Sequence, residues 1–297
     1  MGTITEIVEC RWLDYDNYIE LYEAVYLFSK IRSAGFEKSG ITQSAYKAAV
    51  RILTVCGLLD DAEKQRHILN NIIGEDRTNH YAEFLSKATN KSQFFFDSIS
   101  ELEYEIYSRC NFEVTFDIGV EVAKYVDFSK TKVLELGGNS GGLGAALLTT
   151  YMDCRHTVVD TQIPCAVGNE INETRKQNIT FIEGNAFELR LPPEKYDYIV
   201  LSNLLHDFDD EKCLRILRNC KKHCGRGTKF VVIEDILTGE LEPKEVVMHG
   251  LRLSVECRGG RQRTADEIAG LFAKIEYDLD ENIKLSNIHT MLVMGAV

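Results

Sequence analysis

The strongest constraint on the fold is the alternation of short apolar runs with helix-like segments in the C-terminal half of the chain. The runs have strand length and are rich in Leu, Ile and Val; they span residues 132–136, 156–159, 179–183, 197–201 and 229–233. Strands that alternate with helices predict a parallel sheet covered on both faces. Residues 275–297 add a closing hairpin. We therefore predict an α/β fold with a doubly wound, mostly parallel, seven-stranded sheet over residues 131–297.

The N-terminal part of the chain predicts short helices and no long strands. In residues 1–90, Leu21 and Val25 recur at helical spacing, and a second apolar stripe around Ala49 follows Thr42, a suitable N-cap. This pattern is typical of a small, helical, winged-helix-like domain. Residues 91–130 are rich in aromatic side chains and predict a helical linker or a lid over an apolar ligand.

The net charge of the chain disfavours some classes of binding partner. It carries 46 acidic against 34 basic side chains, a net charge of −12, which disfavours nucleic acid because phosphate neutralisation supplies most of that affinity. No secretory signal and no apolar run of membrane-spanning length is present. The nine cysteines are scattered, as expected for reduced thiols. We expect a cytosolic protein with neither membrane nor nucleic-acid partners.

A glycine-rich segment, residues 137–144, joins the first predicted strand to its helix. Glycines let the backbone turn sharply and approach a ligand closely, and a helix start favours an anionic group. In the dinucleotide pattern the middle glycine would fall at Asn139, which disfavours a nicotinamide cofactor. Glu135 precedes the glycines and suits a ligand with an ammonium group. S-adenosylmethionine has such a group.

Further polar residues follow the next predicted strands. Asp160 ends the second strand, about 20 residues beyond the first glycine, where a carboxylate can accept both ribose hydroxyls. Asn185 and Phe187 follow the third strand, where they can flank an adenine ring. The carboxyl ends of parallel strands meet at one edge of a sheet. The predicted cofactor site therefore comprises Glu135, Gly137, Gly138, Asn139, Asp160, Asn185, Ala186 and Phe187.

These motifs resemble class I S-adenosylmethionine-dependent methyltransferases and, more narrowly, the plant-type O-methyltransferase family with its bacterial small-molecule relatives. The matching segments are residues 135–138, 184–187, 201–211, 233–235 and 259–264. The resemblance implies a Rossmann-like methyltransferase sheet, S-adenosylmethionine as the cofactor with Ser202 among its contacts, and a homodimer built through residues 1–90.

The resemblance also assigns the chemistry. It implies that His206 is the general base, that Asp207 contacts or orients the substrate, and that Glu234 holds the histidine ring. A neutral imidazole can accept a hydroxyl proton near neutral pH, and a carboxylate on its other nitrogen fixes the tautomer. His249 and Gln262 are expected on the acceptor side. The leading prediction is methyl transfer to a hydroxyl of a small-molecule secondary metabolite, without a metal.

Two alternatives stay open at this point. His206, Asp207 and His249 could form a two-histidine, one-carboxylate metal set, which would support metal-assisted C-methylation of a 2-oxo acid. Gln262 stands where the family often has Glu, and Asn185 where it usually has Asp. Together with the short N-terminal domain, Gln262 leaves open a non-catalytic paralogue that only binds S-adenosylmethionine.

Overall fold

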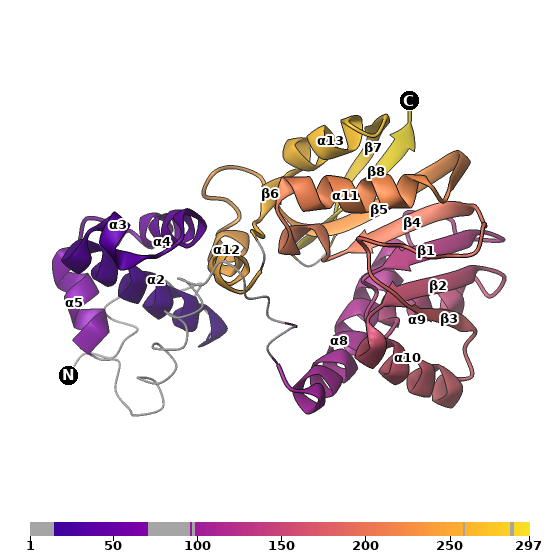
Figure 1. Cartoon of the computed structure of the whole chain (residues 1–297), viewed down its shortest axis with the longest axis horizontal. Coiled ribbons are helices and arrows are strands. Elements are labelled where there is room, and N and C mark those ends of the chain that lie inside the picture. Colours follow the sequence, from indigo (N-terminus) through magenta and orange to yellow (C-terminus); the bar gives the residue numbers. More distant parts are fainter. Residues whose placement is uncertain (1–14, 71–95, 97–98, 258, 286–287) are drawn as a thin grey trace. The chain divides into compact units, whose positions relative to one another are not determined.

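The computed structural model describes residues 15–70, 96, 99–257, 259–285 and 288–297 (Figure 1). Two compact units make up the chain. The first unit is Met1–Asp97 with Leu237–Gln262, and the second is Ser98–Ile236 with Arg263–Val297. Both units are therefore built from segments that are far apart in the sequence.

The second unit contains the predicted sheet. Its strands run in the order β3-β2-β1-β4-β5-β8-β7, with the two-residue β6 paired to β5. The strands are β1 (Lys132–Leu136), β2 (Arg155–Asp160), β3 (Ile179–Glu183), β4 (Tyr196–Ser202), β5 (Cys224–Leu237), β6 (Arg263–Thr264), β7 (Tyr277–Lys284) and β8 (His289–Ala296). The pairs among β1 to β5 are parallel, and β8 is antiparallel to both β5 and β7. This topology confirms the predicted doubly wound, mostly parallel sheet and its closing hairpin.

Helices cover both faces of this sheet, as the βαβ pattern requires. Figure 1 shows α8, α9 and α10 on one side of the sheet and α11 and α13 on the other. Their bounds are α8 (Glu101–Val122), α9 (Gly142–Thr150), α10 (Gln162–Arg175), α11 (Asp210–Lys221) and α13 (Ala265–Ala273). On the α8 side, Ile118 and Leu143 pack with strand residues such as Val231. On the other face, Phe230 contacts the rings of Phe272 and Tyr277.

Local sequence signals place several of these helix ends. Asp209 caps α11, because its carboxylate accepts a hydrogen bond from the Lys212 amide. Thr264 and Glu267 form a capping box at the start of α13. Gly142 begins α9 where a Cβ atom would lie 2.1 Å from the carbonyl oxygen of Phe112 in α8. Only glycine allows these two helices to approach so closely.

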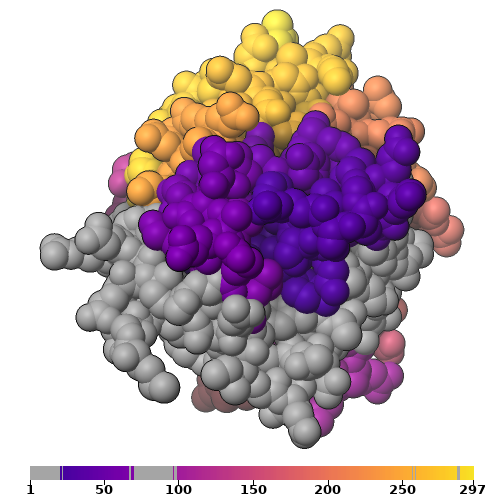
Figure 2. All heavy atoms as spheres, turned by 90° about the vertical axis from the view of Figure 1, so that its left-hand side faces the viewer, coloured from indigo at the N-terminus to yellow at the C-terminus, as the bar shows by residue number. Residues whose placement is uncertain are grey.

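The first unit is helical. It comprises α2 (Tyr15–Ala34), α3 (Phe36–Ser39), α4 (Gln43–Val55), α5 (Ala62–Asn70) and α12 (Lys244–Glu256). Thr42 caps α4 as predicted, and α4 ends just before Gly57, which adopts a φ of 65°. The two predicted stripes, from Leu21 and from Ala45, are buried together in one core. Figure 2 shows the helices that carry these stripes, in indigo to purple, as one continuous patch of atoms.

The division of the chain differs from the predicted domain boundaries in two places. Residues 131–297 were expected to form one domain, but α12 belongs to the first unit, because Val246, Met248 and Leu251 pack in the core of α2 and α4. The expected linker, residues 91–130, contains α8, which packs within the second unit. Apolar periodicity identifies a buried helix face but not the partner that buries it.

Other expectations for the N-terminal part stay predictions. These are the winged-helix-like character of residues 1–90 and the lid, whose aromatic residues Phe94 and Phe95 lie outside the described residues. The apolar stripes of residues 1–90 pack inside the first unit itself, and the homodimer rests on the resemblance alone. Among the described ranges, no helix has the length and hydrophobicity to cross a membrane, and the eight described cysteines are free thiols.

Candidate active site

The glycine-rich loop between β1 and α9 has the backbone conformation that its sequence requires. Gly137, Asn139 and Gly141 adopt positive φ angles of 67°, 50° and 82°. Glycine adopts this left-handed region readily, and asparagine does so more often than other residues with a Cβ atom. A Cβ atom on Gly138 would lie 2.6 Å from the carboxyl carbon of Glu135. The loop therefore lies directly on the carboxylate that precedes it.

Glu135 is fully buried and paired. Its Oε2 lies 2.7 Å from Nε2 of His156 on the adjacent strand β2. Burial lowers the pKa of His156, but the neighbouring side chains of Cys154 and Glu135 outweigh it and raise the pKa to about 9. The other oxygen of Glu135, Oε1, is buried and has no hydrogen-bond partner among the described residues. It is an acceptor without a donor.

Asp160 lies beside the glycine loop, at the carboxyl end of β2. Its two oxygens accept hydrogen bonds of 2.7 Å from the main-chain amides of Asn139 and Thr161. Burial raises the pKa of Asp160 to about 6, although these amides oppose the shift. The structure therefore brings together Asn139 and Asp160, two of the predicted cofactor residues that are far apart in the sequence.

The residues after β3 form a compact turn. The Asn185 side chain accepts a hydrogen bond of 2.8 Å from the Phe187 amide, and Asn219 of α11 donates to the carbonyl oxygens of Ala186 and Phe187. The half-buried Phe187 ring meets Phe208 edge-on at 5.0 Å. A flat apolar side chain is thus fixed where an adenine was expected.

The predicted catalytic residues converge where β4 and β5 end. His206 lies in a short 3-10 turn, Leu205–Asp207, and Glu234 lies on β5. Glu234 Oε2 is 2.7 Å from Nδ1 of His206, and its Oε1 accepts main-chain hydrogen bonds from Leu204 (3.1 Å) and Leu205 (2.8 Å). One buried carboxylate therefore holds both the histidine ring and the turn that carries it. Ser202 is also buried and lies at the end of β4, just before this turn in the sequence.

The electrostatics of His206 follow from the surrounding carboxylates. Burial lowers its pKa, but the negative charge of Glu234, with smaller contributions from Asp207 and Asp235, raises the pKa to about 9. Asp207 Oδ1 lies 3.6 Å from Nε2 of His206. The imidazole is partly exposed, with 18% of its side chain accessible. Nε2 is thus the nitrogen left to meet a substrate, beside a carboxylate.

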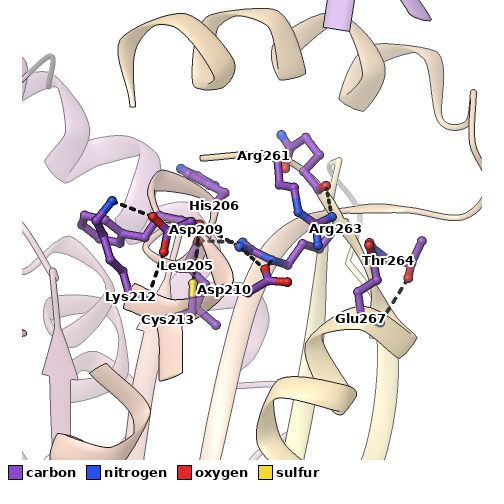
Figure 3. Close-up of polar contacts among 12 residues, drawn as sticks. Leu205, His206, Asp209, Asp210, Lys212, Cys213, Arg261, Arg263, Thr264 and Glu267 are labelled. Carbon is purple, nitrogen blue, oxygen red and sulfur yellow. Dashed lines mark hydrogen bonds and ion pairs between the residues drawn. The ribbon is translucent and has the colours of Figure 1, made fainter. Parts of the chain in front are cut away.

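The buried side chain of Arg263 stabilises the turn that carries His206. None of the sequence-based predictions assigned this residue a role, although it lies in the matching segment 259–264. Arg263 donates hydrogen bonds to the carbonyl oxygens of Leu205 (2.8 Å) and Phe208 (2.7 Å), and it pairs with Asp210 at 2.8 Å (Figure 3). Its side chain is 2% exposed. A guanidinium so deeply buried stays in place only with its donors satisfied. Arg263 thus fixes both ends of the turn.

His249 and Gln262 belong to the first unit, His249 within α12. Their expected place on the acceptor side of the site stays a prediction, and so does the metal set that includes His249. Among the described residues, no group of three or more histidine, cysteine, aspartate or glutamate side chains is arranged to hold a metal ion.

Sequence reasoning missed three side chains near the predicted site. They are Arg263, His156 and His289; the Nε2 atom of His289 lies 3.1 Å from the side-chain nitrogen Nδ2 of Asn203 and 3.6 Å from Asp235 Oδ1. No local pattern singles out either residue, because His156 lies between Arg155 and Thr157 in β2 and His289 is the first residue of β8. Neither partner follows from the sequence, because each contact joins different strands or loops.

Residues 67–278 match the model of a family described as the O-methyltransferase domain. The chain is 31% identical over 155 residues to strychnine O-methyltransferase of Strychnos nux-vomica, an alignment that covers 50% of this chain and 41% of that enzyme. The chain therefore spans less than half the length of this relative.

Solved structures share the fold. An O-methyltransferase family 2 protein from Planctomyces limnophilus, in complex with apigenin, superposes with a TM-score of 0.76 at 15% identity, covering 95% of both chains. Human N-acetylserotonin methyltransferase in complex with SAM gives a TM-score of 0.65 at 18% identity, covering 100% of this chain and 99% of that one. At these identities the likeness establishes the fold.

Proposed function

The chain belongs to the O-methyltransferase domain family, and from this membership we propose that it transfers a methyl group from S-adenosylmethionine to a hydroxyl group of a small molecule. The observation that carries the proposal is the pair of His206 and Glu234, 2.7 Å apart, at the edge of the sheet where the glycine loop and Asp160 also lie. A proton acceptor and a nucleoside-binding edge are the two parts that such a reaction needs.

The residues at this edge fit the proposed cofactor. Oε1 of Glu135 is a buried acceptor without a donor, which an ammonium group would satisfy. We assign Asp160 to the ribose hydroxyls, and Phe187, beside Ala186 and Asn185, to the adenine. Gly137 and Gly138 have no side chains, so a ligand can approach the main chain there closely. Ser202 has a buried hydroxyl with no hydrogen-bond partner among the described residues, which supports its place in the site.

His206 is the proposed general base. When bound, S-adenosylmethionine supplies an electrophilic methyl group on its sulfonium. His206 would accept the proton of the acceptor hydroxyl at Nε2, which makes the oxygen a better nucleophile. As the O–CH₃ bond forms, the bond between the methyl carbon and sulfur would break and S-adenosylhomocysteine would leave. Glu234 stabilises the resulting imidazolium through Nδ1. Asp207, beside Nε2, would orient the hydroxyl.

The names of the relatives support a small-molecule acceptor, because they include strychnine and N-acetylserotonin methyltransferases and an apigenin complex. We further propose a role in secondary metabolism and, from the resemblance, a homodimer in the cytosol. Sedimentation at micromolar concentration tests the dimer: a single monomeric boundary would contradict it.

Methyl transfer from labelled S-adenosylmethionine to a panel of phenols and hydroxylated heterocycles tests the function. We expect label in the product, and loss of turnover in His206→Asn with unchanged binding of S-adenosylhomocysteine. Tight cofactor binding without transfer to any acceptor would favour the non-catalytic paralogue. Activity that is lost with a chelator and restored by a divalent metal would favour the C-methylation alternative.

A further inference from the structure

The buried pair of Glu135 and His156 lies under the glycine loop, and the proposed chemistry does not use His156. Glu135 pairs with Val158 across β1 and β2, so His156, two residues before Val158, projects from the same face. The Glu135 Oε2 and His156 Nε2 atoms are 2.7 Å apart, and both side chains are at most 1% exposed. The two residues form one closed unit beneath the loop.

Glycines on both sides make room for this pair. A Cβ atom on Gly138 would lie 2.6 Å from the Glu135 carboxyl carbon, and one on Gly144 would lie 2.5 Å from the His156 ring. The loop and the first turn of α9 therefore pack directly on the two side chains. A change in this pair would therefore shift the loop that is proposed to bind the cofactor.

The charges around Glu135 explain why a cationic partner matters. A carboxylate without a partner is costly to bury and takes up a proton instead. The titratable groups that face the pair are Cys154 and Asp160, and Asp160 adds negative charge. The described neighbours on β4 at this level are apolar, with Val200 opposite Glu135. Within this group of side chains, His156 carries the positive charge that keeps Glu135 ionised.

We infer that His156 is a positioning residue for cofactor binding: it holds Glu135 as a carboxylate, engages Oε2, and leaves Oε1 for the ammonium group of the cofactor's amino-acid part. The inference rests on the proposed function. If the inference holds, His156 affects the binding of only the amino-acid part of the cofactor, because the ribose and the adenine are assigned to other residues.

Calorimetry with two ligands tests this selectivity at neutral pH. S-adenosylhomocysteine carries the ammonium group, and 5′-methylthioadenosine has the same nucleoside without the amino-acid part. In His156→Gln we expect S-adenosylhomocysteine to bind about 10- to 100-fold more weakly, the range of one charge-assisted hydrogen bond. The affinity for 5′-methylthioadenosine should stay that of the wild type. Equal loss of both ligands, or no loss, would overturn the inference.

The matched control is His223→Gln, the same substitution at the amino end of the sheet, where the His223 carbonyl oxygen accepts a hydrogen bond from the Tyr196 amide. We expect both ligands to bind it as they bind the wild type. If His156→Gln does not fold, the wild-type protein still tests the inference by NMR: the His156 ring should be protonated at neutral pH, and a neutral ring would overturn it. Failure of the proposed function is distinct, because the wild type would then bind neither ligand.

Discussion

Replacing Arg263 by alanine tests how the catalytic turn is held. The guanidinium is 2% exposed and donates to the carbonyl oxygens of Leu205 and Phe208, which lie on either side of His206. Hydrogen bonds to a charged group contribute about 1.5–3 kcal/mol each. The partner carboxylate of Asp210 is half exposed, at 50%, so that ion pair adds little.

The two main-chain bonds together predict that Arg263→Ala lowers the free energy of unfolding by about 3–6 kcal/mol. Urea denaturation measures this as a fall in the transition midpoint at an unchanged m-value. Catalysis should fall as well, because the turn then loses two of its anchors, while binding of S-adenosylhomocysteine stays unchanged.

The control is Arg109→Ala. Arg109 also contacts two carboxylates, Glu105 at 2.9 Å and Glu170 at 2.6 Å, but its side chain is 40% exposed. Exposed ion pairs contribute about 0–1 kcal/mol. If Arg263→Ala and Arg109→Ala destabilise the protein equally, or if Arg263→Ala keeps full activity, the bracing role of the buried guanidinium is refuted.

Three further outcomes follow from the same geometry. With the pKa of His206 at about 9, kcat/KM should rise as the pH approaches that value. Glu234→Gln should lower both the pH midpoint of this rise and the maximal kcat/KM. A kcat/KM that does not change with pH would contradict the role of His206 as the general base. The same raised pKa stabilises the fold below about pH 6.5, and this contribution is lost as the pH rises through about 9. With the pKa of Asp160 raised to about 6, cofactor affinity should fall as the pH drops through that value, and Asp160→Asn should bind weakly at every pH tested by calorimetry. Gly144→Ala places a methyl group 2.5 Å from the His156 ring and should cost about 1–3 kcal/mol of stability; unchanged thermal unfolding would show that the ring yields freely.

The parts of the fold that depend on neighbouring residues were predictable from the sequence. The strands 132–136 and 179–183 and the Thr42 cap are all confirmed. Each depends on periodicity or on a side chain that bonds to its own backbone a few residues away. The carboxyl-end arrangement of Asp160 follows from the parallel order of the strands alone.

The parts that depend on distant partners were not predictable. Nothing in residues 244–256 indicates that α12 packs with α2 and α4 and not with the sheet, because an apolar helix face fits either core. The pairing of His156 with Glu135 requires the register of β1 against β2. The contacts of Arg263 require the fold of the turn 205–208. In each case the sequence supplies the residue and tertiary structure supplies its partner.

The measurement that tests the central claim most directly is single-turnover methyl transfer by enzyme saturated with S-adenosylmethionine and a phenolic acceptor, compared between the wild type and His206→Asn. Loss of a general base should slow transfer by about 10²- to 10⁴-fold, while the dissociation constant for S-adenosylhomocysteine stays the same in both proteins. If His206→Asn transferred the methyl group at the wild-type rate, the pair formed by His206 and Glu234 would not be the catalytic centre.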